Sequence, residues 1–157
     1  VLPALRRLRA SGRRFSLRVI GAAESFSLPG LELETRPWAR EREVRDFQEL
    51  DIGLAPIHAT EFSKGKCAFK QLQYMAVGVP SVSSPEGGST DFIVHGENGL
   101  FARTDDEWFR SLEALLDDAA LRSRIARAGR ELVERSHSIE AQAPRLAEIL
   151  KRAAAAR

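Results

Sequence analysis

Apolar residues in the first forty positions follow a helical spacing and then the spacing of strands. Residues 1–10 place apolar side chains at helical intervals, and Ser11 and Gly12 end that pattern. Residues 15–20 (FSLRVI) have the β-branched and apolar content of a strand. In residues 31–36 (LELETR), Leu alternates with polar residues, which is typical of a half-exposed strand at a sheet edge.

The rest of the chain continues this alternation and then becomes helical. The pattern predicts helices over 41–50 and 67–75 and strands over 51–56 and 79–84, with a last strand within 95–102. Thr104 and Glu107 form a capping box that starts a helix, and two further amphipathic helices follow over 121–133 and 139–150. Pro144 either kinks the last helix or marks its true start.

Strands that alternate with helices pair in parallel through right-handed crossovers. The sequence therefore predicts an α/β fold with a Rossmann-like doubly wound parallel sheet and a helical C-terminal segment. Ligands of such sheets bind beyond the carboxyl ends of the strands. Ligand-binding residues are therefore expected in the loops after the strands that end at residues 36, 56 and 84.

Composition limits the classes of function. With 157 residues, 43% hydrophobic and 29% charged, the chain fits a single domain over 1–157. A net charge of +2 is too small for a dedicated nucleic-acid binder, so no nucleic-acid partner is expected. No apolar run approaches the roughly 20 residues of a membrane span. We expect a cytoplasmic protein, with a peripheral position on the inner face of the membrane as the alternative.

Cysteine, histidine and arginine usage narrows the chemistry further. Cys67 is the single cysteine, and three scattered histidines make no recognisable metal site with it, so neither a disulfide nor a metal cofactor is expected. Residues 1–40 hold eight arginines against three glutamates. That excess is compatible with an anionic partner, but the solvated face of an amphipathic helix is the favoured interpretation.

Two segments carry candidate chemistry. Residues 64–80 (KGKCAFKQLQYMAVGVP) join a glycine-containing loop to a helix whose start is rich in lysine, which brings backbone N–H groups and ammonium groups together as an anion site. A buried helix with solvated lysines explains the same pattern. Residues 84–91 (SPEGGSTD) carry paired glycines after a buried strand, which allow the backbone to approach a ligand or simply make a tight turn.

Taken together, residues 73–102 (QYMAVGVPSVSSPEGGSTDFIVHGENGLFA) resemble the signature of the group 1 family of retaining GT-B glycosyltransferases, in its C-terminal, donor-binding half. In that family the pattern E-x-F-G-x-x-x-x-E-A-M-A-x-G-x-P-V-V precedes a G-G-x-x-E turn and a G-x-x-G-x-L element. Trp38, Glu43 with Val44, and residues 51–56 (DIGLAP) are similar to one branch of it. The resemblance covers about residues 15–150.

The resemblance implies a donor site for a UDP- or GDP-linked sugar. Its nucleotide-sugar-binding positions fall on Trp38, Gly65, Cys67, Ala68, Phe69, Gln73, Gly87, Gly88 and Asp91. Gln73 takes the place of the glutamate that bonds the ribose, and Gly65 that of the glutamate that holds the sugar hydroxyls. Backbone N–H groups of Cys67 and Ala68 would face the sugar, and the loop around Trp38 would stack the base.

The resemblance also implies a retaining, metal-independent transfer. Lys66 and Lys70, at positions without a fixed counterpart in the family, are the expected catalytic cations that stabilise the leaving diphosphate. Because Gly65 brings no carboxylate, the usual recognition of the sugar is in doubt, with Glu61 as a speculative substitute. The acceptor, as in cell-surface polysaccharide biosynthesis, would bind a separate N-terminal domain, so this chain alone is expected to be inactive.

The family strand order 3-2-1-4-5-6 implies one more feature. Val1 starts after the family's central first strand, so the chain is expected to be a fragment with a gap between its strands at 15–20 and 52–55. A neighbouring chain, a rearranged segment or a strand of the native protein would fill the gap. The alternative function is a degenerate, non-catalytic remnant that serves as a binding or assembly module, as Gly65 and Gln73 favour.

Overall fold

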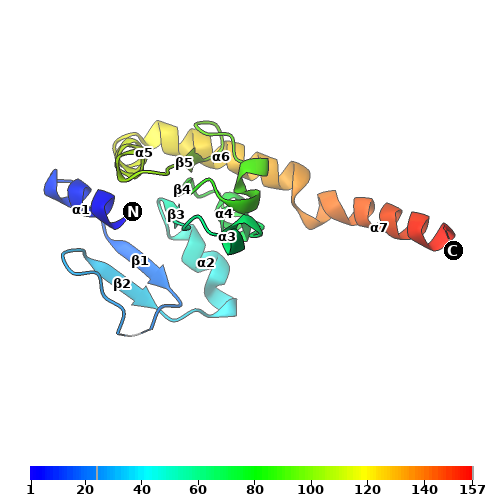
Figure 1. Ribbon diagram of the computed structural model, residues 1–157, viewed down its shortest axis with the longest axis horizontal. Helices are drawn as coiled ribbons and strands as arrows, with labels where there is room; N and C mark the ends of the chain where they lie inside the picture. Colours follow the sequence, from blue (N-terminus) through cyan, green and yellow to red (C-terminus); the bar gives the residue numbers. More distant parts are fainter. Residues whose placement is uncertain (24, 157) are drawn as a thin grey trace.

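The strands form two parallel sheets: the three-stranded sheet lies among the helices, and the two-stranded sheet lies at one side of the molecule (Figure 1). The structure is a computed structural model that describes residues 1–23 and 25–156. Its strands are β1 (Leu17–Ile20), β2 (Leu33–Arg36), β3 (Gly53–Ala55), β4 (Ser81–Ser83) and β5 (Leu100–Phe101). Its helices are α1 (Leu2–Ala10), α2 (Glu43–Gln48), α3 (Glu61–Lys64), α4 (Phe69–Ala76), α5 (Asp105–Asp117), α6 (Ala119–Ser136) and α7 (Ile139–Ala155), with 3-10 turns η1 (Arg40–Arg42) and η2 (Gly87–Asp91).

Each strand pair is parallel, and the pairs belong to two separate sheets. β1 pairs with β2 in one sheet, and β3-β4-β5 form the other. Helix α2 joins β2 to β3, and helices α3 and α4 join β3 to β4. Crossover connections of this kind are what parallel pairing requires. The predicted Rossmann-like α/β fold is confirmed, with β2 at an edge as its alternating pattern indicated.

The two sheets face each other across a groove at the predicted gap. N–H groups of Leu17 and Gly21 bond β2, so those of Arg18 and Ile20 point toward the groove. On the other side Gly53 donates to Pro80, which turns the N–H of Leu54 toward the groove. The cavity measures about 770 Å³, and its walls include α1, β1, β3 and α5. Two strand edges therefore flank an apolar space.

The hydrophobic core lies on both sides of β4. Its larger part joins α1, β4, β5, α5 and α6, and its smaller part joins Phe47 of α2 to Tyr74 of α4 with an edge-to-face ring contact of 5.2 Å. Arginines of the N-terminal region pair with acidic residues of α5: Arg13 lies 2.6 Å from Asp117, and Arg7 bonds Asp106. Part of the local arginine excess is thus paired within the fold.

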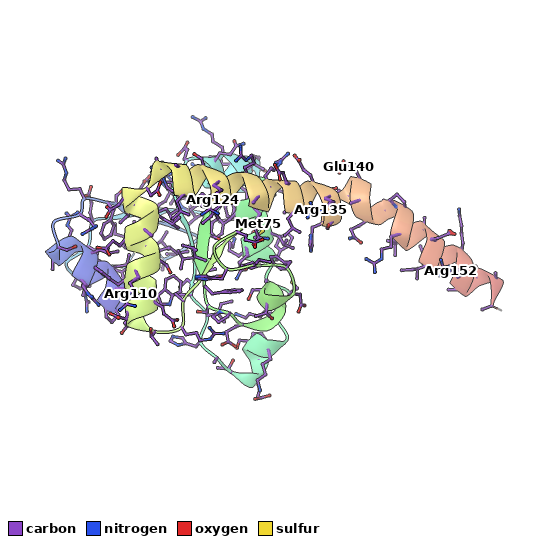
Figure 2. The ribbon with its side chains drawn as sticks, turned by 90° about the horizontal axis from the view of Figure 1, so that it is seen from above. Met75, Arg110, Arg124, Arg135, Glu140 and Arg152 are labelled. Atoms are coloured by element: carbon purple, nitrogen blue, oxygen red, sulfur yellow. The ribbon has the colours of Figure 1, made fainter. Side chains whose placement is uncertain are left out.

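The C-terminal helices differ in how much they contact the body. α6 crosses over α4, where a Cβ atom at Gly129 would lie 2.9 Å from Met75 Cγ, so the two helices pack closely at this glycine (Figure 2). α7 projects away and contains no buried residue. It begins at Ile139 with Pro144 inside it, so the alternative that Pro144 marks its start is wrong. Within the described residues, every helix is too short or too polar to span a bilayer.

Thr104→Ala tests the capping box that starts α5. The Thr104 hydroxyl accepts the N–H of Glu107, and the Glu107 carboxylate accepts the N–H of Thr104. Loss of an N-cap side chain costs about 1 kcal/mol. We expect urea unfolding followed by circular dichroism to show that loss, whereas Thr104→Ser retains stability. Equal stability of both variants would contradict the assignment.

Candidate functional site

The start of α4 leaves three neighbouring backbone N–H groups without a protein partner. Ala68, at the N-cap, adopts the left-handed conformation (φ 56°, ψ 34°), and Phe69 begins the helix. In the described part of the chain the N–H groups of Ala68, Phe69 and Lys70 find no acceptor. A left-handed residue next to right-handed ones turns successive N–H groups toward one point, which makes an anion-binding concavity.

The helix prediction over 67–75 was wrong at its first two residues. Cys67 and Ala68 precede α4, because the left-handed backbone of Ala68 cannot continue a right-handed helix. Ala68 is buried, whereas Cys67 and Gly65 are exposed. The short helix α3 before them was missed; Thr60 and Ser63 form its capping box.

The paired glycines lie directly against the loop before α4. Gly88 donates its N–H to the carbonyl of Lys66 at 2.8 Å. A Cβ atom at Gly87 would lie 2.4 Å from the same oxygen, and one at Gly88 would lie 3.5 Å from the Cys67 backbone. Position 87 has a φ of +59° and lies close to the Lys66 carbonyl, so only glycine fits there. The structure thus brings the predicted loops 64–68 and 84–91 together.

Trp38 and Gln73 both donate a hydrogen bond to Glu43, a residue that the sequence interpretation had not assigned to the site. The indole Nε1 of Trp38 donates to Oε1 of Glu43 at 3.1 Å, and Nε2 of Gln73 donates to the same oxygen at 3.2 Å. Glu43 is the first residue of α2, and Trp38 lies in the loop after β2. The Trp38 side chain is 56% exposed, so much of its surface is accessible to a ligand.

The two candidate lysines point to different places. Lys70 Nζ lies 4.8 Å from the ring centre of Phe47 and lines the groove together with Trp38 and Glu43. Lys66 Nζ instead lies 5.6 Å from the ring of Phe62, which is itself 80% exposed. Lys70 is therefore the cation that the structure brings to the Trp38 side of the site.

The remaining predicted side chains lie at the surface. Phe69 is 63% exposed, and Asp91 is exposed at the end of η2. Glu61 pairs with Lys64 at 2.6 Å, and its side chain is 91% exposed, so it does not replace the missing carboxylate at Gly65 in this arrangement. Among residues 1–23 and 25–156, no cluster of three or more His, Cys, Asp or Glu side chains could hold a metal ion.

Ion pairs position the Trp38 loop. Arg36, at the end of β2, lies 3.0 Å from the buried carboxylate of Asp46 and 2.8 Å from Glu49, both in the α2 segment. The Glu49 and Glu34 carboxylates raise the pKa of Arg36 above its ordinary value, and Arg36 in turn lowers the pKa of Glu49. These charges hold β2 against α2 on either side of Trp38.

Tyr74 fixes α4 against β3. Its ring lies over Gly53, where a Cβ atom would come within 2.6 Å of it, and its hydroxyl donates to the Leu54 carbonyl at 3.1 Å. Burial raises the pKa of Tyr74 to about 12. The hydroxyl therefore stays protonated and continues to donate at neutral pH.

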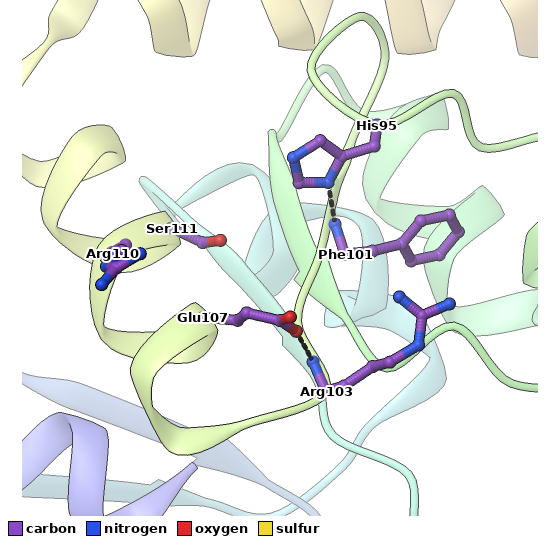
Figure 3. Close-up of a pocket in the computed structure, with 6 residues that line it drawn as sticks. All are labelled: His95, Phe101, Arg103, Glu107, Arg110 and Ser111. Atoms are coloured by element: carbon purple, nitrogen blue, oxygen red, sulfur yellow. Dashed lines mark hydrogen bonds between the residues drawn. The ribbon is translucent and has the colours of Figure 1, made fainter.

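A second hollow, of about 400 Å³, lies between β5 and α5 (Figure 3). There the Phe101 N–H donates to His95 Nδ1 at 2.9 Å, and the Arg103 N–H donates to Glu107 at 2.6 Å. Hydrogen bonds from the backbone N–H groups of Arg103 and Thr104 lower the pKa of Glu107. The hollow contains none of the predicted site residues, and its polar contacts serve the turn into α5.

Comparison with protein families decides the class of this protein. A family described as glycosyl transferase-like matches residues 2–148. The chain belongs to this family. A comparison with curated proteins finds no match.

Solved structures share the fold of this glycosyl transferase-like domain. Sucrose-phosphate synthase of Thermosynechococcus elongatus is similar with a TM-score of 0.75 and 15% identity, over 99% of this chain and 43% of that chain. The C-terminal domain of LpcC, a glycosyl transferase group 1 family protein of Francisella tularensis, has a TM-score of 0.57 and 23% identity, over 70% and 56% of the two chains. HepE of Anabaena, solved in complex with UDP and glucose, has a TM-score of 0.64 and 17% identity, over 76% of this chain and 32% of that chain.

The solved structures that share this fold are longer chains. The chain spans between 32% and 56% of the length of the three solved structures. The resemblance to the C-terminal half of GT-B group 1 glycosyltransferases is confirmed at the level of family and fold.

Gly87→Ala tests the contact between the two loops of the glycosyl transferase-like domain. Besides its positive φ, the new Cβ meets the Lys66 carbonyl, and overpacking costs about 1–3 kcal/mol. Gly78→Ala is the matched control, because Gly78 also has a positive φ (+75°) but nothing lies within 4 Å of its Cβ position. We expect urea unfolding to show the larger loss for Gly87→Ala. Equal losses would mean that the loops do not touch.

Proposed function

We propose that this domain binds the nucleotide-diphosphate sugar of a glycosyltransferase and supports transfer of the sugar with retention of configuration. The observation that carries the proposal is the concavity of free N–H groups at Ala68, Phe69 and Lys70 beside the Gly87–Gly88 turn. Such a concavity fits a pyrophosphate. Trp38, further along the same site, offers an exposed aromatic surface to a uracil or guanine base.

In the proposed mechanism the protein stabilises charge on the leaving group. Cleavage of the bond between the anomeric carbon and the diphosphate oxygen leaves an oxocarbenium-like centre on the sugar and a negative charge on the nucleoside diphosphate. The N–H groups at the start of α4 and the Lys70 ammonium group stabilise that charge, and Lys66 assists by moving away from Phe62. The acceptor hydroxyl, held by another domain, then bonds the anomeric carbon and gives its proton to the oxygen of the leaving diphosphate.

A further β-strand is proposed to fill the groove between β1 and β3. The groove is bordered by the inward N–H groups of Arg18, Ile20 and Leu54, and Val1 lies on its wall. Val1 also lies 3.6 Å from Asp105, which follows β5, so α1 starts at the carboxyl end of the strands. A parallel strand that leads into α1 would complete a right-handed crossover to β1.

Nucleotide titration tests the donor site. We expect saturable binding of UDP or GDP in calorimetry, weakened about tenfold by Lys70→Ala and less by Lys66→Ala, because a cation on a phosphate contributes roughly 1.4 kcal/mol. Lys64→Ala is the control, since Lys64 pairs with Glu61 on the exposed side of α3. Absence of binding at millimolar UDP and GDP would contradict the proposal and favour the non-catalytic remnant, which Gly65 and Gln73 support.

Hydrogen exchange tests the inserted strand. In a longer protein that contains this domain, the amides of Arg18, Ile20 and Leu54 are expected to exchange at least tenfold more slowly than in residues 1–157 alone. The amide of Gly53, which already bonds Pro80, is the internal reference. Unchanged rates in the longer protein would rule out a strand in the groove, and slow exchange only at high concentration of the short chain would point to a second copy.

A further inference from the structure

We infer that Glu43 is the residue that recognises the ribose of the bound nucleotide, with Gln73 as its partner; this inference rests on the proposed nucleotide site. Oε1 of Glu43 already accepts two N–H groups, from Trp38 and from Gln73. In the described part of the chain, Oε2 of Glu43 has no hydrogen-bond partner. A carboxylate oxygen without a donor beside an open aromatic ring is an acceptor ready for a ligand hydroxyl.

The orientation of Gln73 adds a second acceptor. Because its Nε2 donates to Glu43, its amide oxygen is the end left for a ligand. Gln73 and Glu43 together thus present two acceptor oxygens to a ligand. A vicinal diol presents two O–H donors, which is the complementary pattern. Acidic side chains bind ribose hydroxyls in this way in other nucleotide sites.

The same contacts orient the aromatic surface next to the diol site. The hydrogen bond from Nε1 to Glu43 fixes the rotation of the Trp38 indole, whose ring remains 56% exposed. Lys70 precedes Gln73 by three residues on α4, so the two side chains share one helix face. The Trp38 ring, the diol site and the Lys70 ammonium group thus follow the same order as the base, the ribose and the phosphate of a nucleotide.

Charge at the ribose therefore comes from α2 rather than from α4. Gln73 alone is neutral, and a hydrogen bond to a charged acceptor is about twice as strong as one to a neutral acceptor. Glu43 supplies the missing charge across the space between the two helices. A carboxylate at both positions would place like charges close together, which is unfavourable without water.

Discrimination between UDP and 2′-deoxy-UDP tests this inference by calorimetry. The unaltered protein is expected to bind UDP about tenfold more tightly than 2′-deoxy-UDP, the change for one lost bond to a charged group. Glu43→Gln can still accept from Trp38, and it is expected to reduce that preference to twofold or less. Glu41→Gln is the matched control, because Glu41 is exposed within η1 and has no contact with Trp38 or Gln73.

A swap of the carboxylate and the amide between positions 43 and 73 provides a second test. Gln73→Glu alone should weaken UDP binding, because two carboxylates then face each other. The double variant Glu43→Gln with Gln73→Glu restores one carboxylate and one amide and should recover the preference for UDP over 2′-deoxy-UDP. A purely structural role for Glu43 would weaken both nucleotides equally in Glu43→Gln, and that result would overturn the inference.

The outcomes also separate this inference from the proposed function. Tight UDP binding with an unchanged preference in Glu43→Gln overturns the role of Glu43 and leaves the nucleotide site intact. Failure of the unaltered protein to bind UDP or GDP overturns both. If GDP binds instead of UDP, the same comparison with 2′-deoxy-GDP applies, and the same preference is expected.

Discussion

The site depends on a close approach of two backbone segments. Gly87 lies where any side chain would meet the Lys66 carbonyl, and Gly88 donates its N–H to that oxygen. This contact occupies the carbonyl side of the loop before α4. The N–H groups that follow it, at Ala68, Phe69 and Lys70, have no protein acceptor in the described part of the chain. An anion compensates such groups better than a neutral ligand does.

Parallel strand topology places the other components at the same edge. The loops after β2, β3 and β4 lead to Trp38, to α3 and to the paired glycines, and they all start at carboxyl ends of strands. Packing of Tyr74 on Gly53 fixes α4 relative to β3, and the ion pairs of Arg36 fix α2 relative to β2. The bridge from Glu43 to Gln73 then connects these two halves across the groove.

Sequence patterns predicted the elements better than the site. Alternation and helical spacing located the strands and the long helices, because these patterns depend on which face is buried. The position of the start of α4 was wrong by two residues, since the left-handed backbone of Ala68 has no signature in a residue that is not glycine or asparagine. Glu43 was noted only as part of a resemblance, and its contact with Gln73 spans thirty residues, which no local pattern reports. The separation of Lys66 from Lys70 likewise depends on which aromatic ring each one approaches.

Amide chemical-shift mapping is the most direct test of the central claim. On addition of UDP or GDP to the isotope-labelled protein, the largest shifts are expected at the backbone N–H groups of Ala68, Phe69 and Lys70, followed by the indole N–H of Trp38. Nucleotide binding with its largest shifts in the hollow formed by His95, Arg103 and Glu107, and none at the start of α4, would contradict the account.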